Sequence, residues 1–176
     1  LDPLTRSFSK HFLPVYDKPM FFYPMSTLLL SGIKEILLIA NERDIELFKC
    51  MLGDLNRFEF ELSFKIQEQP RGIGESLLLA EEFLQGQACA LVLGDNLFFG
   101  SGFSNILRKA NEDIKSSTVF SIPVKTPSEY GVVELAESGK IKSIEEKPIN
   151  PKSDNVLTGL YFFDSRAPSL AKKISP

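Results

Sequence analysis

A regular alternation of short apolar runs with segments of helical periodicity constrains the fold of this chain more than any other feature. The run "EILLIA" (35–40) predicts a buried strand, and residues 43–52 then place apolar groups at helical spacing until Gly53 ends the pattern. The alternation continues with predicted strands at 60–66, 88–94 and 118–124 and predicted helices at 74–84 and 102–111. Strands joined by helices of this length require right-handed crossovers. We therefore expect an α/β fold with a mostly parallel sheet and helices on both faces.

After Pro127 the pattern changes from helical crossovers to an antiparallel hairpin. The elements predicted there are two hairpin strands, a third strand and the start of a helix, at 131–135, 140–147, 156–164 and 168–174. No internal repeat or low-complexity linker separates the two patterns. We therefore predict one domain over residues 1–176, composed of a first part at 1–127 and a second part at 128–176.

Composition and charge exclude several classes of function. The chain carries 20 basic and 23 acidic residues without a block of like charge, which argues against a nucleic-acid surface. The longest apolar stretch (19–33) is broken by Pro24 and Ser26 and is too short for a bilayer, so it predicts a buried helix rather than a membrane span. Two cysteines without paired spacing and a single histidine argue against a disulfide scaffold or a zinc site, and they favour a reducing cytoplasm.

The stretch "CALVLGDNLFFG" (89–100) places Asp95 at the end of a run that reads as a buried strand. In open parallel sheets, ligands bind outside the carboxyl ends of the strands. A carboxylate at that position can hold Mg²⁺, which takes one or two protein carboxylates and completes its shell with water and phosphate oxygens. Alternatively, Asp95 only caps a turn or the next helix. The motif by itself leaves both interpretations open.

Three further stretches carry groups suited to a phosphorylated ligand, and each has a plainer explanation. Lys10 lies in a proline-rich loop, where its ammonium group can bind phosphate or can simply be solvated. Gln67 can read the edge of a pyrimidine, and Gly72 allows the backbone to approach a flat ligand, although a glycine there can also serve only the turn. The segment "EEKP" (145–148) ends a predicted strand with acid beside base, a pattern that also fits a solvated hairpin end.

Together and in this order, these stretches resemble the sugar nucleotidyltransferases, and within them the thymidylyl branch. The matching phrases span the chain: "PLTR" (3–6), "SKHFLPVYDKPM" (9–20), "LVLGDNLFFG" (91–100), "YGVVEL" (130–135), "SIEEKP" (143–148) and "TGLYFFD" (158–164). The resemblance implies a Rossmann-like nucleotidyltransferase fold and Mg²⁺-dependent transfer from dTTP to glucose 1-phosphate, giving dTDP-glucose and pyrophosphate. It also implies a cytoplasmic homo-oligomer, a tetramer in the family, with no nucleic acid or membrane partner.

The resemblance assigns roles to ten positions, of which it implies that Lys10, Asp95 and Lys147 are catalytic. On the nucleotide side, in residues 1–127, it implies that Lys10 contacts phosphates, Gln67 and Gly72 bind the thymine base, Asp95 holds Mg²⁺ and Asn96 lies beside it. On the sugar-phosphate side, in residues 128–176, it implies a pocket formed by Gly131, Glu146, Lys147, Leu157 and Gly159. Neighbours in a regular strand point to opposite faces, so Glu146 and Lys147 can serve one ligand only if the backbone turns at "EEKP".

Several features depart from the family pattern. His11 stands where many members have glutamine, and "RGIGES" (71–76) replaces a more usual "DGLAQA". The family's glycine-rich loop, ending in Gly-Thr-Arg, and its first strand are expected just before Leu1, and a second metal-binding aspartate is expected beyond Pro176. We expect a chain limited to these residues to be inactive, so the function belongs to the parent protein.

Two alternative functions remain open at this point. The first is the same chemistry with UTP or another sugar 1-phosphate, because thymine and uracil differ by one methyl group, which a pocket can weigh at only about 1–3 kcal/mol. The second is a non-catalytic homologue that binds nucleotide sugars.

Overall fold

The computed structural model describes residues 2, 5, 9–53, 59–69, 71–112, 114 and 116–174. Of the stretches quoted above, "PLTR" (3–6) lies outside the described residues except for Thr5. None of the helices in these described segments is long and apolar enough to cross a membrane.

The first βαβ unit agrees with the sequence prediction. Strands β3 (Glu35–Ala40) and β4 (Glu61–Ile66) pair in parallel along their full length, and helix α2 (Glu42–Leu52) lies between them in sequence. Asn41 caps this helix by accepting a hydrogen bond from the Asp44 backbone N–H at 2.8 Å, an interaction that typically stabilises a helix by about 1 kcal/mol. Gly53 ends the helix with φ 62°, a left-handed conformation that glycine adopts without a Cβ penalty.

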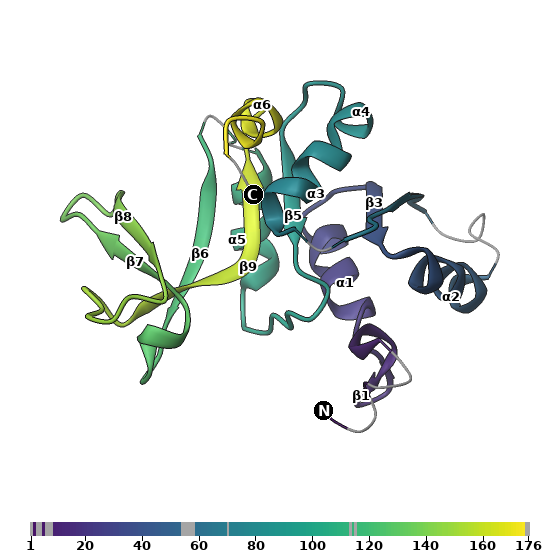
Figure 1. The fold of residues 1–176 in the computed structure, drawn as a ribbon, viewed down its shortest axis with the longest axis horizontal. Helices are drawn as coiled ribbons and strands as arrows, with labels where there is room; N and C mark the ends of the chain where they lie inside the picture. Colours follow the sequence, from purple (N-terminus) through teal and green to yellow (C-terminus); the bar gives the residue numbers. More distant parts are fainter. Residues whose placement is uncertain are drawn as a thin grey trace.

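A second sheet is built around the long strand β9 (Asn155–Phe163). The order β5-β9-β7-β8 is completed by β6, which also pairs with β9. The other four strands are β5 (Cys89–Val92), β6 (Thr118–Pro123), β7 (Gly131–Leu135) and β8 (Ile141–Glu146). Figure 1 shows the β7–β8 hairpin projecting from one end of this sheet, on the side opposite to β3 and α2.

The α/β class is confirmed, but the pairing differs from the mostly parallel sheet that we expected. Both β5 and β6 pair antiparallel with β9, so they run in the same direction as each other. That common direction is the one that their crossover helix α5 (Phe103–Glu112) requires. Strand β9 follows the β7–β8 hairpin rather than a helical crossover, and it enters between β5 and β6 in the opposite sense. The shared direction of β5 and β6 was therefore predicted correctly, whereas the antiparallel strand β9 between them was not.

The remaining helices cover the sheets and depart from the predictions in detail. The apolar stretch at 19–33 forms the helix α1 (Phe22–Leu30). The single helix predicted at 74–84 is split at Ala80 into α3 (Ile73–Leu79) and α4 (Glu81–Leu84), and the last helix is α6 (Ala167–Ala171). The loop predicted at 9–19 contains short elements, which are the 3₁₀ turn η2 (Lys10–Phe12) and the antiparallel pair β1 (Pro14–Val15) and β2 (Lys18–Pro19). A second 3₁₀ turn, η4 (Pro127–Glu129), precedes β7.

Two main apolar clusters hold the elements together. One packs α1 and α2 against β3, with the buried residues Phe21, Met25, Ile36, Phe48 and Leu52. The other packs α5 against β9, with the buried residues Leu107, Leu160 and Phe162. Because large side chains in both clusters are almost completely removed from water, these contacts fix the positions of the strand ends described below.

A cavity of about 750 Å³ lies between the two sheets. It is lined by every residue of β3 and of β5, and among the described residues β3 pairs only with β4 and β5 only with β9. Each strand therefore has one edge without a strand partner in this part of the chain. A strand placed in this cavity would find hydrogen-bond partners on both sides.

Candidate active site

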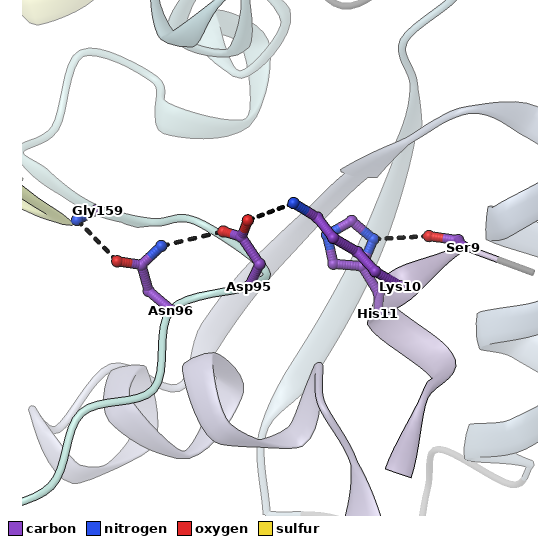
Figure 2. Close-up of polar contacts among 6 residues, drawn as sticks. All are labelled: Ser9, Lys10, His11, Asp95, Asn96 and Gly159. Atoms are coloured by element: carbon purple, nitrogen blue, oxygen red, sulfur yellow. Dashed lines mark hydrogen bonds and ion pairs between the residues drawn. The ribbon is translucent and has the colours of Figure 1, made fainter. Parts of the chain in front are cut away.

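Asp95 lies just beyond the carboxyl end of β5, as the sequence predicted, and it pairs with Lys10. The Lys10 ammonium group donates a hydrogen bond to the Asp95 Oδ2 atom across 85 residues of sequence. Figure 2 shows this pair continued through Asn96 to Gly159, with a separate contact between Ser9 and His11 beside Lys10. Both side chains keep contact with solvent, with exposed fractions of 43% for Lys10 and 34% for Asp95. The pair is therefore accessible to a ligand.

The 3₁₀ turn η2 holds Lys10 in place through its two following residues. Phe12 packs its ring against that of Phe48 at a centroid distance of 4.5 Å, which anchors the turn to the core. The His11 backbone carbonyl accepts a hydrogen bond from the Phe21 N–H at 3.1 Å. A lysine in a short turn would otherwise have many conformations, so these contacts place its ammonium group beside the end of β5.

Burial and neighbouring charges shift the pKa values of Asp95 and of the nearby His11. Partial burial alone would raise the pKa of Asp95, but hydrogen bonds from the Lys10 ammonium and the Asn96 amide outweigh it and hold the pKa below its ordinary value. Burial, together with the Lys10 charge, lowers the pKa of His11. At neutral pH the Asp95 side chain is therefore a carboxylate and the His11 ring is a neutral imidazole.

The His11 ring lies against the backbone that leads into Asp95. Its Nδ1 atom is 2.8 Å from the Ser9 hydroxyl oxygen, which fixes the ring orientation. An added Cβ at Gly94 would lie only 2.8 Å from the His11 Cδ2 atom. Glycine is thus required at this position by the close approach of the ring. Sequence reasoning noted His11 only as a departure from the family pattern, because no local signal connects it with Gly94.

Asn96 joins Asp95 to strand β9. Its Nδ2 atom donates to the Asp95 Oδ1 atom at 3.0 Å, and its Oδ1 atom accepts from the Gly159 backbone N–H at 3.0 Å (Figure 2). The structure therefore brings together four of the positions singled out from the sequence, which are Lys10, Asp95, Asn96 and Gly159.

Gln67 and Gly72 lie in the connection from β4 to α3, as predicted, and Gln67 lines the same cavity as His11 and Gly94. The Gln67 Nε2 atom donates to a Glu75 carboxylate oxygen at 2.6 Å, and the same oxygen accepts from the Arg71 backbone N–H at 3.0 Å. Gly72 has φ 91° at the start of α3, a conformation that explains the glycine. Glu75 is a residue that sequence reasoning missed, and it holds this connection closed.

The predicted sugar-phosphate residues gather on the second sheet. Gly131 pairs with Glu146, and a Cβ at Gly131 would lie 3.0 Å from a Glu146 carboxylate oxygen and 3.6 Å from the Leu157 Cδ1 atom. The Glu146 charge also reaches the neighbouring Tyr161, whose pKa is raised chiefly by burial and further by this carboxylate. Tyr161 is a second residue that the sequence did not single out.

The backbone turns at "EEKP", as the paired role of Glu146 and Lys147 requires. Strand β8 ends at Glu146, and Lys147 has φ 45°, in the left-handed region that a non-glycine residue rarely occupies. Its backbone N–H donates to the Tyr130 carbonyl at 3.0 Å, and the following Pro148 is buried. Both charged side chains are exposed, so the turn leaves them available to a ligand.

The residues present fit a magnesium ion of the kind that substrate phosphates complete. Asp95 offers one accessible carboxylate, which is the minimum for such a site. Within the described segments there is no cluster of three or more histidine, cysteine, aspartate or glutamate residues that could hold a metal by themselves. The donor set therefore suits a shared metal and not a site built only from protein ligands.

Comparisons with known proteins identify the family of this chain. The nucleotidyl transferase family model matches residues 1–176. The chain is 46% identical over 176 residues to glucose-1-phosphate thymidylyltransferase of Neisseria meningitidis and 41% identical to that of Xanthomonas campestris. Both matches include the whole of this chain but only 61% and 60% of the relatives, so the chain spans about three fifths of their length.

Solved structures show the same fold. A Bacillus anthracis protein assigned as a glucose-1-phosphate thymidylyltransferase, crystallised with sucrose, matches with a TM-score of 0.88 and 30% identity, over the whole of this chain and 71% of that one. A UDP-glucose pyrophosphorylase matches with a TM-score of 0.82 at 20% identity, over 100% and 76% of the two chains, which supports the fold alone. With a family match along its full length and this agreement in fold, the chain belongs to the nucleotidyl transferase family.

Proposed function

We propose that the full-length protein transfers a nucleotidyl group from dTTP to glucose 1-phosphate, giving dTDP-glucose and pyrophosphate. The observation that carries the proposal is the accessible Lys10–Asp95 pair at the end of β5, in a chain similar to glucose-1-phosphate thymidylyltransferases along its whole length. Cytoplasmic location and homo-oligomeric assembly remain parts of the proposal that rest on the sequence.

The chemistry requires charge and positioning more than covalent help. An oxygen of the sugar phosphate forms a bond to the α-phosphorus of dTTP, and the bond from that phosphorus to the bridging oxygen of pyrophosphate breaks. A sugar phosphate is already a nucleophile at neutral pH, so no activated serine or cysteine is needed. The protein must instead hold two polyanions together and neutralise the charge that develops.

Lys10 and Asp95 have complementary parts in this scheme. When the triphosphate is bound, the Lys10 ammonium group would leave the carboxylate and contact phosphate oxygens as a compact point charge. Asp95 would then hold Mg²⁺, and that ion would supply positive charge to the phosphate oxygens. Because both side chains are partly exposed, breaking this ion pair would cost little free energy. Lys10 would exchange Asp95 for phosphate, and Asp95 would exchange Lys10 for the metal ion.

The second sheet supplies the proposed sugar-phosphate side. Lys147 would contact the phosphate, and Glu146 would accept hydrogen bonds from sugar hydroxyl groups. The turn at Lys147 supports this division, because it frees both side chains from the alternation of a regular strand. Gly131 lies against both Glu146 and Leu157, and the two residues Gly131 and Leu157 would close the pocket from behind.

Gln67 is proposed to read the base. Its Nε2 atom donates a hydrogen bond to Glu75, so nucleotide binding would exchange this hydrogen bond for one to the pyrimidine edge. A leucine at this position would leave the base partners unpaired, at a cost of about 1–3 kcal/mol for each buried group. Gln67→Leu should therefore raise the KM for dTTP strongly and the KM for glucose 1-phosphate little.

The test measures pyrophosphate release by the full-length protein with glucose 1-phosphate and dTTP, UTP, CTP or ATP, with Mg²⁺ or with a chelator. We expect dTTP to be preferred and the chelator to stop the reaction. Asp95→Asn should abolish turnover with a nearly unchanged Tm, whereas Asp154→Asn, an exposed aspartate distant in sequence from the pair, should keep it.

Each other outcome would correct a defined part of the proposal. Faster turnover with UTP would overturn the base assignment and leave the reaction class in place. Full activity of folded Asp95→Asn would overturn the metal role. No pyrophosphate release with any triphosphate would leave a non-catalytic nucleotide-sugar-binding homologue as the function.

A further inference from the structure

The Asn96 side chain lies between the Asp95 carboxylate and strand β9, and both of its polar atoms are engaged (Figure 2). Its orientation is determined by its partners. A backbone N–H can only donate, so the Asn96 atom facing Gly159 must be the carbonyl oxygen. The amino group must then face Asp95, where it donates to Oδ1. The backbone of β9 thus decides which group Asn96 presents to the carboxylate.

Strand β9 is irregular at the point where it meets Asn96. Val119 of β6 pairs with Tyr161, but Ser121 pairs with Leu157, so four residue steps on β9 oppose two on β6. The Thr158 hydroxyl donates to the Phe120 carbonyl at 3.0 Å within this irregularity. Bulges of this kind redirect backbone groups and often lie beside active sites. Beside this irregularity, on the side of β5, the Gly159 N–H donates to the Asn96 side chain.

The contact is close and specific to glycine. An added Cβ at Gly159 would lie 2.7 Å from the Leu93 Cδ1 atom and 2.8 Å from the Asn96 Cγ atom. The backbone closes the same contact from the other side, because the Leu93 N–H donates to the Gly159 carbonyl at 2.8 Å and the Asn96 N–H donates to the Leu93 carbonyl at 3.1 Å. The turn that carries Asp95 is therefore fixed against one point of β9.

We propose that Asn96 is a positioning residue that transmits the position of β9 to the Asp95 carboxylate, rather than a direct ligand of the nucleotide. With Oδ1 of Asp95 held by Asn96, the Oδ2 atom is directed toward Lys10 and the phosphate side of the site. Leu157 lies against the sugar-phosphate residue Gly131. It is on β9, two residues before Gly159. One strand would thus hold the metal-binding carboxylate and the sugar-phosphate pocket in a fixed relation. This inference rests on the proposed function.

Two variants of the full-length protein separate the two hydrogen bonds. Asn96→Ala removes both of them. Asn96→Asp keeps an acceptor for the Gly159 N–H but can no longer donate to Asp95 at neutral pH. Asn111→Ala is the matched control, because it also removes a long-range amide hydrogen bond, the one that Asn111 donates to the Ser31 carbonyl at 3.1 Å. Steady-state kinetics, Tm and hydrogen exchange of the Gly159 amide are measured for each protein.

We expect Asn96→Ala and Asn96→Asp to lower kcat by about 10–100-fold, the usual effect of losing a group that orients a metal ligand, with KM for dTTP nearly unchanged. Asn111→Ala should keep its kcat while its Tm falls as much as that of Asn96→Ala. Exchange of the Gly159 amide should accelerate in Asn96→Ala only. A raised KM for dTTP with unchanged kcat in Asn96→Ala would show direct ligand contact and overturn the proposal, and so would a wild-type kcat in Asn96→Asp.

The exchange measurement also separates this proposal from the proposed function. If no triphosphate supports turnover in the wild-type protein, the proposed function fails, but slow exchange at Gly159 that depends on Asn96 would still confirm the structural link. If the enzyme is active and the Gly159 amide exchanges equally fast in the wild type and in Asn96→Ala, the link itself is wrong.

Discussion

The contact between His11 and Gly94 can be tested by adding a single atom, the Cβ of an alanine at position 94. In Gly94→Ala, the new Cβ would lie 2.8 Å from His11 Cδ2 and 2.9 Å from Nε2, and the three atoms nearest to it all belong to the His11 ring. The ring cannot easily move, since Ser9 holds its Nδ1 atom at 2.8 Å and the Phe21 N–H holds its backbone carbonyl at 3.1 Å. Overpacking of this kind typically costs about 1–3 kcal/mol.

The backbone at Gly94 adds nothing to that cost, because its φ lies outside the left-handed region that disfavours alanine. The penalty should therefore come from the ring and disappear with it. In the His11→Ala background, Gly94→Ala should cost no more than about 0.5 kcal/mol, the range of an ordinary surface substitution. The expected coupling energy between the two changes is about 1–2 kcal/mol, within the range measured for residues in contact.

The assay is urea unfolding of the wild type, the two single variants and the double variant of the full-length protein, with kcat measured in parallel. Gly100→Ala is the control, since nothing lies within 4 Å of a Cβ there and its φ is also outside the left-handed region. Because Gly94 leads directly into Asp95, kcat should fall in Gly94→Ala and recover at least partly in the double variant. Strictly additive unfolding free energies would refute the contact, and an unchanged kcat in Gly94→Ala would refute its link to Asp95.

Two further predictions concern local charge and backbone strain. Lys147→Gly should leave the protein more stable than Lys147→Ala by about 1 kcal/mol, because φ 45° disfavours a residue with a Cβ, and both variants should bind the sugar phosphate more weakly; a less stable glycine variant in urea unfolding would contradict this. Arg166 donates to both carboxylate oxygens of Asp164 and holds the pKa of Asp164 at about 2, so the resulting stability is present above pH 4 and is lost as the pH falls toward 2. Arg166→Gln should move the pKa of Asp164, followed by ¹³C NMR, toward its ordinary value, and an unmoved pKa would show that another group depresses it.

The sequence predicted the elements whose signals are local. Strand β3 has the predicted bounds, and helix α2 begins at its cap and ends at Gly53 because capping and left-handed glycine act within a few residues. The position of Asp95 at a strand end was predicted for the same reason, since the run of apolar residues before it is read directly from the chain. These features depend on neighbours in sequence, and a single sequence contains them.

Other features depend on contacts between distant segments and could not be predicted in this way. The insertion of β9 between β5 and β6 joins residues that are more than 30 positions apart, and nothing in the local pattern distinguishes it from a sheet in sequence order. The approach of His11 to Gly94 is a side-chain contact of the same non-local kind. The hydrogen bond from Gln67 to Glu75 depends instead on the geometry of the loop between them. The family resemblance named Gln67 as a base-binding position and His11 as a departure from the pattern, but it did not name Gly94 or Glu75 as their partners.

The Lys10–Asp95 pair shows why the site must be explained by ligand chemistry and not by stability. An ion pair whose partners are 43% and 34% exposed is worth about 0–1 kcal/mol, because water screens the charges and both side chains lose freedom. A chain that needed only a stable connection between η2 and β5 would gain more from an apolar contact, such as the one that Phe12 makes with Phe48. The accessible pair instead keeps an ammonium group and a carboxylate in place, and each can exchange the other for a ligand at little cost in free energy. A phosphate can then take the first and a metal ion the second without unfolding anything around them.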